Sequence, residues 1–137
     1  MKLKALNKKV DAFNLQELLV VMVIIGILTL IAMPKFMKSV TRAKSSEAKL
    51  QLVTLYGLQK NYYYVNSKYS NNFNDIDFEP PISLNEDGDA YYSYEIIEAS
   101  NTTFKARATA VSDFDGDATL NVWEINQDKK LKEIVKD

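Results

Sequence analysis

The stretch AFNLQELLVVMVIIGILTLIAMP, residues 12–34, decides how the rest of this chain can fold. From Leu18 to Met33 it carries no charged side chain and only one hydroxyl group, that of Thr29. Its length lies near the lower end of the ~17–25 residues that a helix needs to cross the apolar part of a bilayer. The stretch therefore predicts an apolar helix that is a candidate membrane span.

A few polar and conformationally special residues give this stretch a pattern. Glu17 places a carboxylate at its leading edge, Gly26 lies inside it and Pro34 closes it. A short leader, residues 1–12, precedes it and carries lysines that outnumber its one aspartate. The order is thus basic leader, carboxylate, apolar run with an internal glycine, and proline.

This pattern resembles the N-terminus of the type IV pilin superfamily, which includes type IV pilins and the pseudopilins of type II secretion. The family has a basic leader, a small residue, Phe, a hydroxyl residue, Leu, any residue and Glu, and then a long apolar helix. These positions read, in this chain, Ala12, Phe13, Asn14, Leu15, Gln16 and Glu17. Ala12 stands where the family usually has Gly, and Asn14 stands where it usually has Thr or Ser.

The resemblance implies how the N-terminus is processed and used. A membrane-embedded aspartic prepilin peptidase would cut between Ala12 and Phe13, and the new Phe13 amine would be methylated. Glu17 would neutralise the Phe13 amine of a neighbouring subunit and so set the register of assembly. A carboxylate in hydrocarbon costs ~2.5–3.5 kcal/mol on insertion scales, which such a partner would offset. The alternative is a first-turn carboxylate that favours the helix N-terminus and snorkels to the interface.

Gly26 and Pro34 have two interpretations. In the family the segment between them can lose helicity in the filament, and the physics allows this because Gly weakens a helix and Pro removes a hydrogen bond. In the alternative interpretation, the glycine simply permits close packing, as it often does in membrane helices.

Helical periodicity continues past Pro34 to about Tyr64. The positions of this stripe are Phe36, Val40 and Ala43, and then, on a shifted face, Ala48, Leu52, Leu55, Gln59 and Tyr62. A helix from about Asn14 to about Tyr64 would be roughly 75 Å long at ~1.5 Å per residue. A core of this size does not need such a helix, so we expect its apolar N-terminal half to protrude.

The rest of the chain predicts a small sheet. Residues 65–89 read as a connecting loop, because NSKYSNNFND and the pair Pro80-Pro81 disfavour helix and strand. The strand candidates are Tyr91–Ala99, Thr103–Val111, Thr119–Gln127 and Leu131–Val135. The predicted class is α+β, a long helix packed through its C-terminal half on an antiparallel sheet, the lollipop shape of pilins. The predicted segments are the leader 1–12, the assembly helix 13–34, its amphipathic continuation 35–64, the loop 65–89 and the sheet 90–137.

The motif DFDGDAT, residues 113–119, is a candidate cation site with aspartates at Asp113, Asp115 and Asp117. Carboxylates at alternate positions can converge on a hard cation such as Ca²⁺. The frame continues to Asn121 and Glu124 as in an EF-hand loop, but its sixth position is Ala118 rather than Gly and a strand should follow. The alternative is a solvated turn. Major pseudopilins, which this chain resembles, bind calcium near the C-terminal sheet. The resemblance therefore suggests calcium as a ligand of this loop, and we predict that the protein requires no cofactor.

The 137-residue chain contains no cysteine and no histidine. It therefore has no means for Ser-His-Asp or Cys-His catalysis, disulfides or His-ligated metals, and we predict that it is not an enzyme. Many major type IV pilins carry a disulfide near the C-terminus. The missing cysteines, small head and acidic loop thus favour a major-type pseudopilin of type II secretion. A type IV pilus subunit for adhesion, motility or DNA uptake is the alternative.

Charged and aromatic residues are unevenly distributed. The charged residues between positions 35 and 70 are all basic except Glu47, and acidic residues outnumber basic ones from Asn71 onward. This segregation indicates either complementary surfaces on neighbouring subunits or two solvated faces.

The eight tyrosines and the one tryptophan, Trp123, are interpreted mainly as core residues that seal the helix against the sheet. The alternative for the tyrosines is a stacking surface for glycans or single strands.

The resemblance also implies a location and partners. The precursor would cross the bacterial inner membrane once, with its N-terminus cytoplasmic and its head periplasmic, and would then join a periplasmic pseudopilus or a surface pilus. The implied partners are other copies in a helical filament, minor pilins or pseudopilins, prepilin peptidase, the membrane, and an assembly platform with its ATPase. No direct nucleic-acid partner is predicted. An ordinary secretory signal peptide, or an uncleaved anchor for an enzyme or ligand-binding module, stays open.

Overall fold

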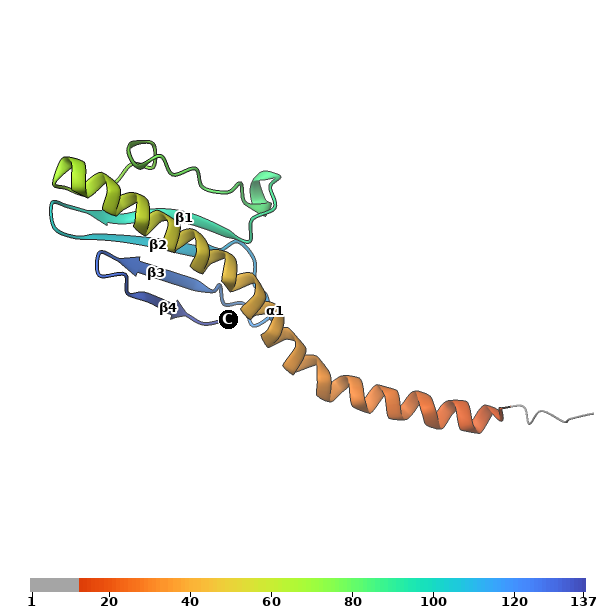
Figure 1. Ribbon diagram of the computed structural model, residues 1–137. Helices are drawn as coiled ribbons and strands as arrows, with labels where there is room; N and C mark the ends of the chain where they lie inside the picture. The colour runs from red at the N-terminus through yellow and green to blue at the C-terminus, as the bar shows by residue number, and fades with distance from the viewer. Residues whose placement is uncertain (1–12) are drawn as a thin grey trace, which may run out of the picture. The chain divides into compact units, whose positions relative to one another are not determined.

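The computed structural model describes residues 13–137, which divide into two compact units, one ending at Phe36 and the other running from Met37 to Asp137. One helix, α1 (Leu15–Asn66), belongs to both units (Figure 1). The later elements are the 3-10 helices η1 (Asn74–Ile76) and η2 (Leu84–Glu86) and the strands β1 (Tyr92–Ala99), β2 (Phe104–Ala110), β3 (Val122–Asn126) and β4 (Leu131–Val135). The predicted α+β class is confirmed.

The first unit presents apolar side chains on all sides. Every residue from Phe13 to Phe36 is exposed. Within α1 an 18-residue window reaches a mean hydropathy of 2.5 with none of its residues buried, so the helix is long and apolar enough to cross a membrane. An isolated helix with such a surface needs lipid or other chains around it.

The strands of the second unit form one antiparallel meander in the order β1-β2-β3-β4. Tyr92 pairs with Ala110 across β1 and β2, and Ile125 pairs with Leu131 across β3 and β4. Figure 1 shows the second half of α1 lying across this sheet. Consecutive strands are neighbours throughout, so short turns suffice to connect them.

The core lies between α1 and the inner face of the sheet. Ala48, Leu52 and Leu55 on α1 are fully buried, as the helical periodicity predicted. Strand β2 alternates buried and half-buried residues, and its buried side chains are Phe104, Ala106, Ala108 and Ala110. Three of these four are alanines, whose small side chains allow a helix to approach the sheet closely.

The first part of the predicted helical stripe is wrong. Phe36 is 65% exposed, and the buried residues nearest to it along the helix are Thr41 and Ser45. Phe36 is the last residue of the first unit, in which every residue from Phe13 onward is exposed, so its apolar side chain continues the apolar segment instead of starting the core. The strand predicted from Thr119 begins only at Val122, so Leu120 precedes β3 and is 40% exposed.

The segment predicted as a loop is more ordered than its composition suggests. It contains η1 and η2, and it buries Tyr69, Ile76 and Phe78 in the core. The segment follows the edge of the sheet beside β1 before it enters that strand (Figure 1). Its buried aromatic and aliphatic side chains attach it to the core without regular strands.

The interpretation of the tyrosines as core residues is confirmed for most of them. Tyr92, Tyr94 and Tyr69 are buried, and the Tyr69 ring lies 4.9 Å from that of Phe104 between centroids. Burial raises the pKa of the Tyr94 phenol, with a further contribution from nearby Glu47. Tyr64, near the end of α1, is the exception and is exposed.

Candidate functional sites

The start of α1 holds the predicted assembly residues. Phe13 is 85% exposed. The Glu17 carboxylate oxygen Oε2 accepts a hydrogen bond from the backbone N–H of Asn14 at 2.9 Å, the reciprocal half of a capping box. Glu17 thus stabilises the first turn of its own helix, as the alternative interpretation of this residue requires. Its role in pairing with a neighbouring amine stays a prediction.

The predicted processing site extends beyond the structure. Ala12, with the rest of the leader, lies outside the described residues, whereas Phe13 on the other side of the bond lies within them. Cleavage between Ala12 and Phe13 therefore stays a prediction from the sequence.

The segment from Gly26 to Pro34 is helical in this structure. Pro34 lies inside α1, which continues on both sides of it. The hydroxyl of Thr29 donates to the carbonyls of Ile25 at 3.0 Å and Gly26 at 2.8 Å. A Cβ atom added at Gly26 would have nothing within 4 Å, so no contact among the described residues requires glycine there. The predicted loss of helicity in a filament stays open.

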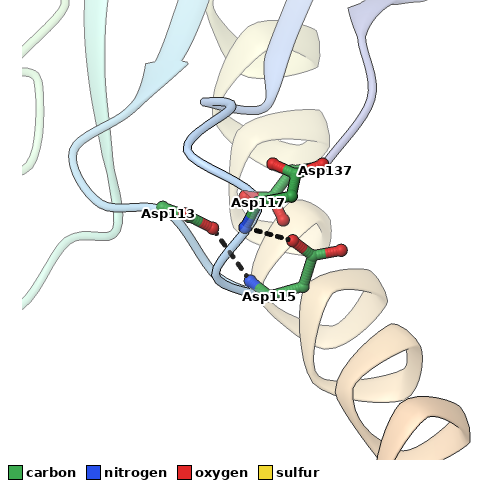
Figure 2. A group of neighbouring side chains, drawn as sticks. All are labelled: Asp113, Asp115, Asp117 and Asp137. Atoms are coloured by element: carbon green, nitrogen blue, oxygen red, sulfur yellow. Dashed lines mark hydrogen bonds between the residues drawn. The ribbon is translucent and has the colours of Figure 1, made fainter.

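The predicted aspartate cluster gains a fourth member in the structure. Carboxylate oxygens of Asp113, Asp115, Asp117 and Asp137 lie within 4.8 Å of one another. Figure 2 shows Asp137 reaching this loop from the end of the chain. No sequence pattern pointed to Asp137, because only the pairing of β4 with β3 returns it to the loop before β3.

Hydrogen bonds inside the loop organise the aspartates. The Oδ1 atom of Asp113 accepts from the backbone N–H of Gly116 at 2.7 Å, and its Oδ2 atom accepts from that of Ala118 at 2.6 Å. These bonds lower the pKa of the Asp113 carboxyl. Asp137 accepts from the backbone N–H of Phe114 at 2.9 Å, but burial, with the nearby charges of the loop, raises its pKa.

As expected from the sequence, the aspartate loop does not continue into an EF-hand, because strand β3 and not a helix follows it. Ala118 does adopt a left-handed φ of 66°, so the missing glycine does not prevent a sharp turn. Asn121, however, is fully buried and accepts from the Tyr92 hydroxyl at 2.7 Å, while Glu124 accepts from Arg107 at 2.7 Å. Both potential ligands are committed elsewhere, and the following element is strand β3.

The four carboxylates suit a hard cation by their chemistry. Ca²⁺ takes six to eight oxygen ligands, and four carboxylates with nearby water could supply them. Several of these oxygens accept backbone N–H groups, so a cation would share or replace those bonds. Asp113, Asp115, Asp117 and Asp137 are the residues that could hold it.

The sequence also missed polar residues that position the sheet. The Glu47 carboxylate on α1 accepts from the backbone N–H of Tyr91 at 3.0 Å and from the hydroxyl of Tyr94 at 3.2 Å. It thereby fixes the beginning of β1 against the helix. Its position as the one acidic residue of a basic stretch was the signal that could have indicated a structural partner.

An N-terminal helix with an apolar first half, followed by a four-stranded antiparallel meander, has the α+β architecture of pilin subunits. A family model described as "Type IV minor pilin ComP, DNA uptake sequence receptor" matches residues 34–120. The chain belongs to the type IV pilin family. Membership points to a structural, non-enzymatic protein that assembles into filaments with other pilins.

A curated relative gives the same classification. The chain is 42% identical over 80 residues to the type IV major pilin protein PilA of Myxococcus xanthus (strain DK1622). The aligned region is 58% of this chain and 36% of that relative, so this chain covers about a third of the relative's length.

Proposed function

We propose that this chain is the precursor of a structural subunit of a type IV pilus. The observation that carries the proposal is the apolar segment from Phe13 to Phe36, in which no residue is buried. Lipid would cover this segment before assembly, and the same segments of other copies would cover it in the filament core. The names of the matched family and of the PilA relative, both type IV pilins, support the pilus over other filaments.

The N-terminal residues would act in sequence during assembly. The leader would keep the N-terminus on the cytoplasmic side, and cleavage after Ala12 would free the Phe13 amine. Glu17 would then release its own capping bond, or share it, to pair with the amine of a neighbouring copy. Lipid is as apolar as the filament core, so close packing and this ion pair, not hydrophobicity, would favour the assembled state.

Two measurements test this proposal in the native host. We expect deletion of the gene to abolish surface filaments seen by electron microscopy, and the intact gene to restore them. Mass spectrometry of the purified filaments should find this chain beginning at a methylated Phe13. An intact leader on filament protein would contradict the processing, and surface filaments that persist without the gene would contradict the pilus assignment.

A major-type pseudopilin of type II secretion is the second candidate. The absence of cysteine and the four clustered carboxylates favour it, and a calcium ion held by Asp113, Asp115, Asp117 and Asp137 would fit this function. Filaments confined to the periplasm, together with a secretion defect on deletion, would select the pseudopilin. Surface filaments with normal secretion would select the pilus.

DNA binding, which the matched family's description names, is not part of our proposal. Arg107, on the outer face of the sheet, pairs with Glu124 at 2.7 Å and with Glu95 at 3.6 Å. The Arg107 guanidinium is thus already paired with carboxylates and is not a free contact for a phosphate backbone. The chain has a net charge of −1.

A further inference from the structure

Two neighbouring apolar side chains are exposed on the loop that leads into β1. Ile82 is 63% exposed and Leu84 is 46% exposed, whereas Ser83 between them is buried. We call residues 79–89 the entry loop, and it contains four acidic residues and no basic residue. The four, all exposed, are Glu79, Glu86, Asp87 and Asp89. Exposed apolar side chains within a charged rim are typical of a surface that binds another protein.

Backbone hydrogen bonds hold the entry loop in one conformation beside the start of β1 (Figure 1). The Leu84 N–H donates to the Ala90 carbonyl at 2.9 Å, and the Gly88 N–H donates to the Ser83 carbonyl at 2.9 Å. A Cβ atom at Gly88 would collide with the Ile82 carbonyl, so this close approach of two backbone segments requires glycine. Because the loop is already ordered, docking it costs little conformational entropy.

A groove of about 220 Å³ lies on the outer face of the sheet, at its β4 edge. Its lining includes Lys105 of β2, Lys130 before β4, and Lys132 and Ile134 of β4. Ile134 is 49% exposed, so the groove offers apolar surface beside the three lysines. Glu124 also lines it, but its carboxylate is already paired with an arginine of β2 at 2.7 Å. The groove therefore has an excess of positive charge.

The charges of both surfaces find few partners within the chain. Among residues 13–137, no ion pair joins a carboxylate of the entry loop to a cation, or Lys105 or Lys132 to a carboxylate. Lys130 lies 3.9 Å from Asp128, and both side chains are more than half exposed, so this pair contributes little. Opposite charges are thus available on two separate surfaces.

The two surfaces lie at opposite edges of the sheet, because the strand order is β1-β2-β3-β4. They also lie at opposite ends of β2. The entry loop leads to Tyr92, which pairs with Ala110, whereas Lys105 is near the beginning of β2. The loop of one chain therefore cannot fill its own groove. A contact between the two surfaces joins two copies through different faces, and such a contact repeats from copy to copy into a ring or an open helical filament.

We propose that the entry loop of one copy docks in the groove of a second copy when subunits assemble. Ile82 and Leu84 cover the exposed side of Ile134, and Glu86 and Asp87 face the lysines around it. Burial of these apolar side chains favours the contact, and the opposite charges orient the two copies as they approach. This inference rests on the filament subunit of the proposed function and names the surfaces through which neighbouring copies meet.

Zero-length cross-linking tests the contact without any substitution. A carbodiimide joins a lysine amine to a carboxylate as an amide and takes up the water that is lost, so it links only groups in direct contact. Intact cells of the native host are treated, and so is the purified full-length chain dispersed in detergent. We expect mass spectrometry to find entry-loop peptides joined to peptides of Lys130 or Lys132 in the cells, and none in the dispersed chain.

Charge variants assign the link to the proposed pair of surfaces. Lys132→Glu should lower the yield of entry-loop links to Lys130 about fivefold, the upper end of the effect of an exposed ion pair. Adding Glu86→Lys places opposite charges on the two surfaces again and should bring the yield back. Lys68→Glu makes the same change of charge at an exposed position outside the groove and should leave the yield unchanged.

Four results would overturn the proposal. No link in cells whose surface filaments are seen by electron microscopy would overturn the docking alone, and the proposed function would stand. No link together with no filaments would overturn both. An equal yield in the dispersed chain would place the contact within one chain. Entry-loop links to lysines of a different protein would assign the loop to another partner.

Discussion

Gln59 of α1 and Ser70 of the following loop are joined by a closed pair of hydrogen bonds. Gln59 Nε2 donates to the Ser70 carbonyl at 2.6 Å, and the Ser70 backbone N–H donates to Gln59 Oε1 at 3.1 Å. Gln59 is fully buried. The side-chain amide thus provides hydrogen-bond partners for the backbone N–H and carbonyl of Ser70, which lies in a loop and has no neighbouring strand to supply them. These two bonds hold the segment after Asn66 against the helix.

Replacing Gln59 by alanine should destabilise the fold strongly. The variant leaves the Ser70 N–H and carbonyl buried without partners, at a cost of about 1–3 kcal/mol for each group. We expect the urea midpoint of the full-length chain in detergent, followed by near-UV circular dichroism, to fall clearly. Asn61→Ala, exposed on the same helix, is the control. An unchanged midpoint for Gln59→Ala would show that water replaces the amide without loss.

Glu17→Gln should separate the two roles of this residue. Glutamine at this position can still accept from the Asn14 N–H, so the helix cap persists, but it has no charge to neutralise an amine. We expect normal insertion and cleavage and no incorporation into filaments, measured by immunoblots of sheared filaments against whole cells. Glu17→Ala removes the cap as well and should add a local fraying of the first turn. Normal filament levels with Glu17→Gln would remove the charge from the assembly mechanism.

The sequence predicted the features that depend on local periodicity. The helix is continuous through Pro34, and the strand predicted from Thr103 to Val111 is β2, which buries Phe104 and its alanines. The sequence could not predict contacts between residues that are far apart along the chain and meet only in the folded structure. Asp137 joins Asp113 only through strand pairing. Gln59 was correctly placed in the helical stripe, but its hydrogen-bond partner, the backbone of Ser70, could not be read from the sequence.

The aspartate cluster should bind calcium measurably if it acts as a cation site. Binding to the folded state alone stabilises it by about 2.7 kcal/mol at a hundredfold excess over the dissociation constant. We expect the melting temperature of the full-length chain to rise with calcium and to fall with a chelator. Asp115→Asn should weaken this response. Asp77→Asn is the control, because Asp77 lies outside the cluster in a left-handed conformation that asparagine also tolerates. A melting temperature that does not change with calcium would show that the loop is a solvated turn without a cation site.

Asp113 and Asp137 should change the free energy of unfolding in opposite directions as the pH rises. The measurement is made with a chelator present. Bonds from Gly116 and Ala118 lower the pKa of Asp113 below its ordinary 3.8. Its stabilisation is therefore present above that pH and is lost as the pH falls through the lowered value.

Burial raises the pKa of Asp137, so its favourable contribution is present below pH 3.8 and is lost as the pH rises through the raised value. Relative to wild type, Asp113→Asn should lower the urea midpoint most at neutral pH, whereas Asp137→Asn should raise it there. Both differences should shrink toward pH 3. Midpoints of the two variants that shift in the same direction at neutral pH would contradict this assignment, because the two carboxyls would then share one environment.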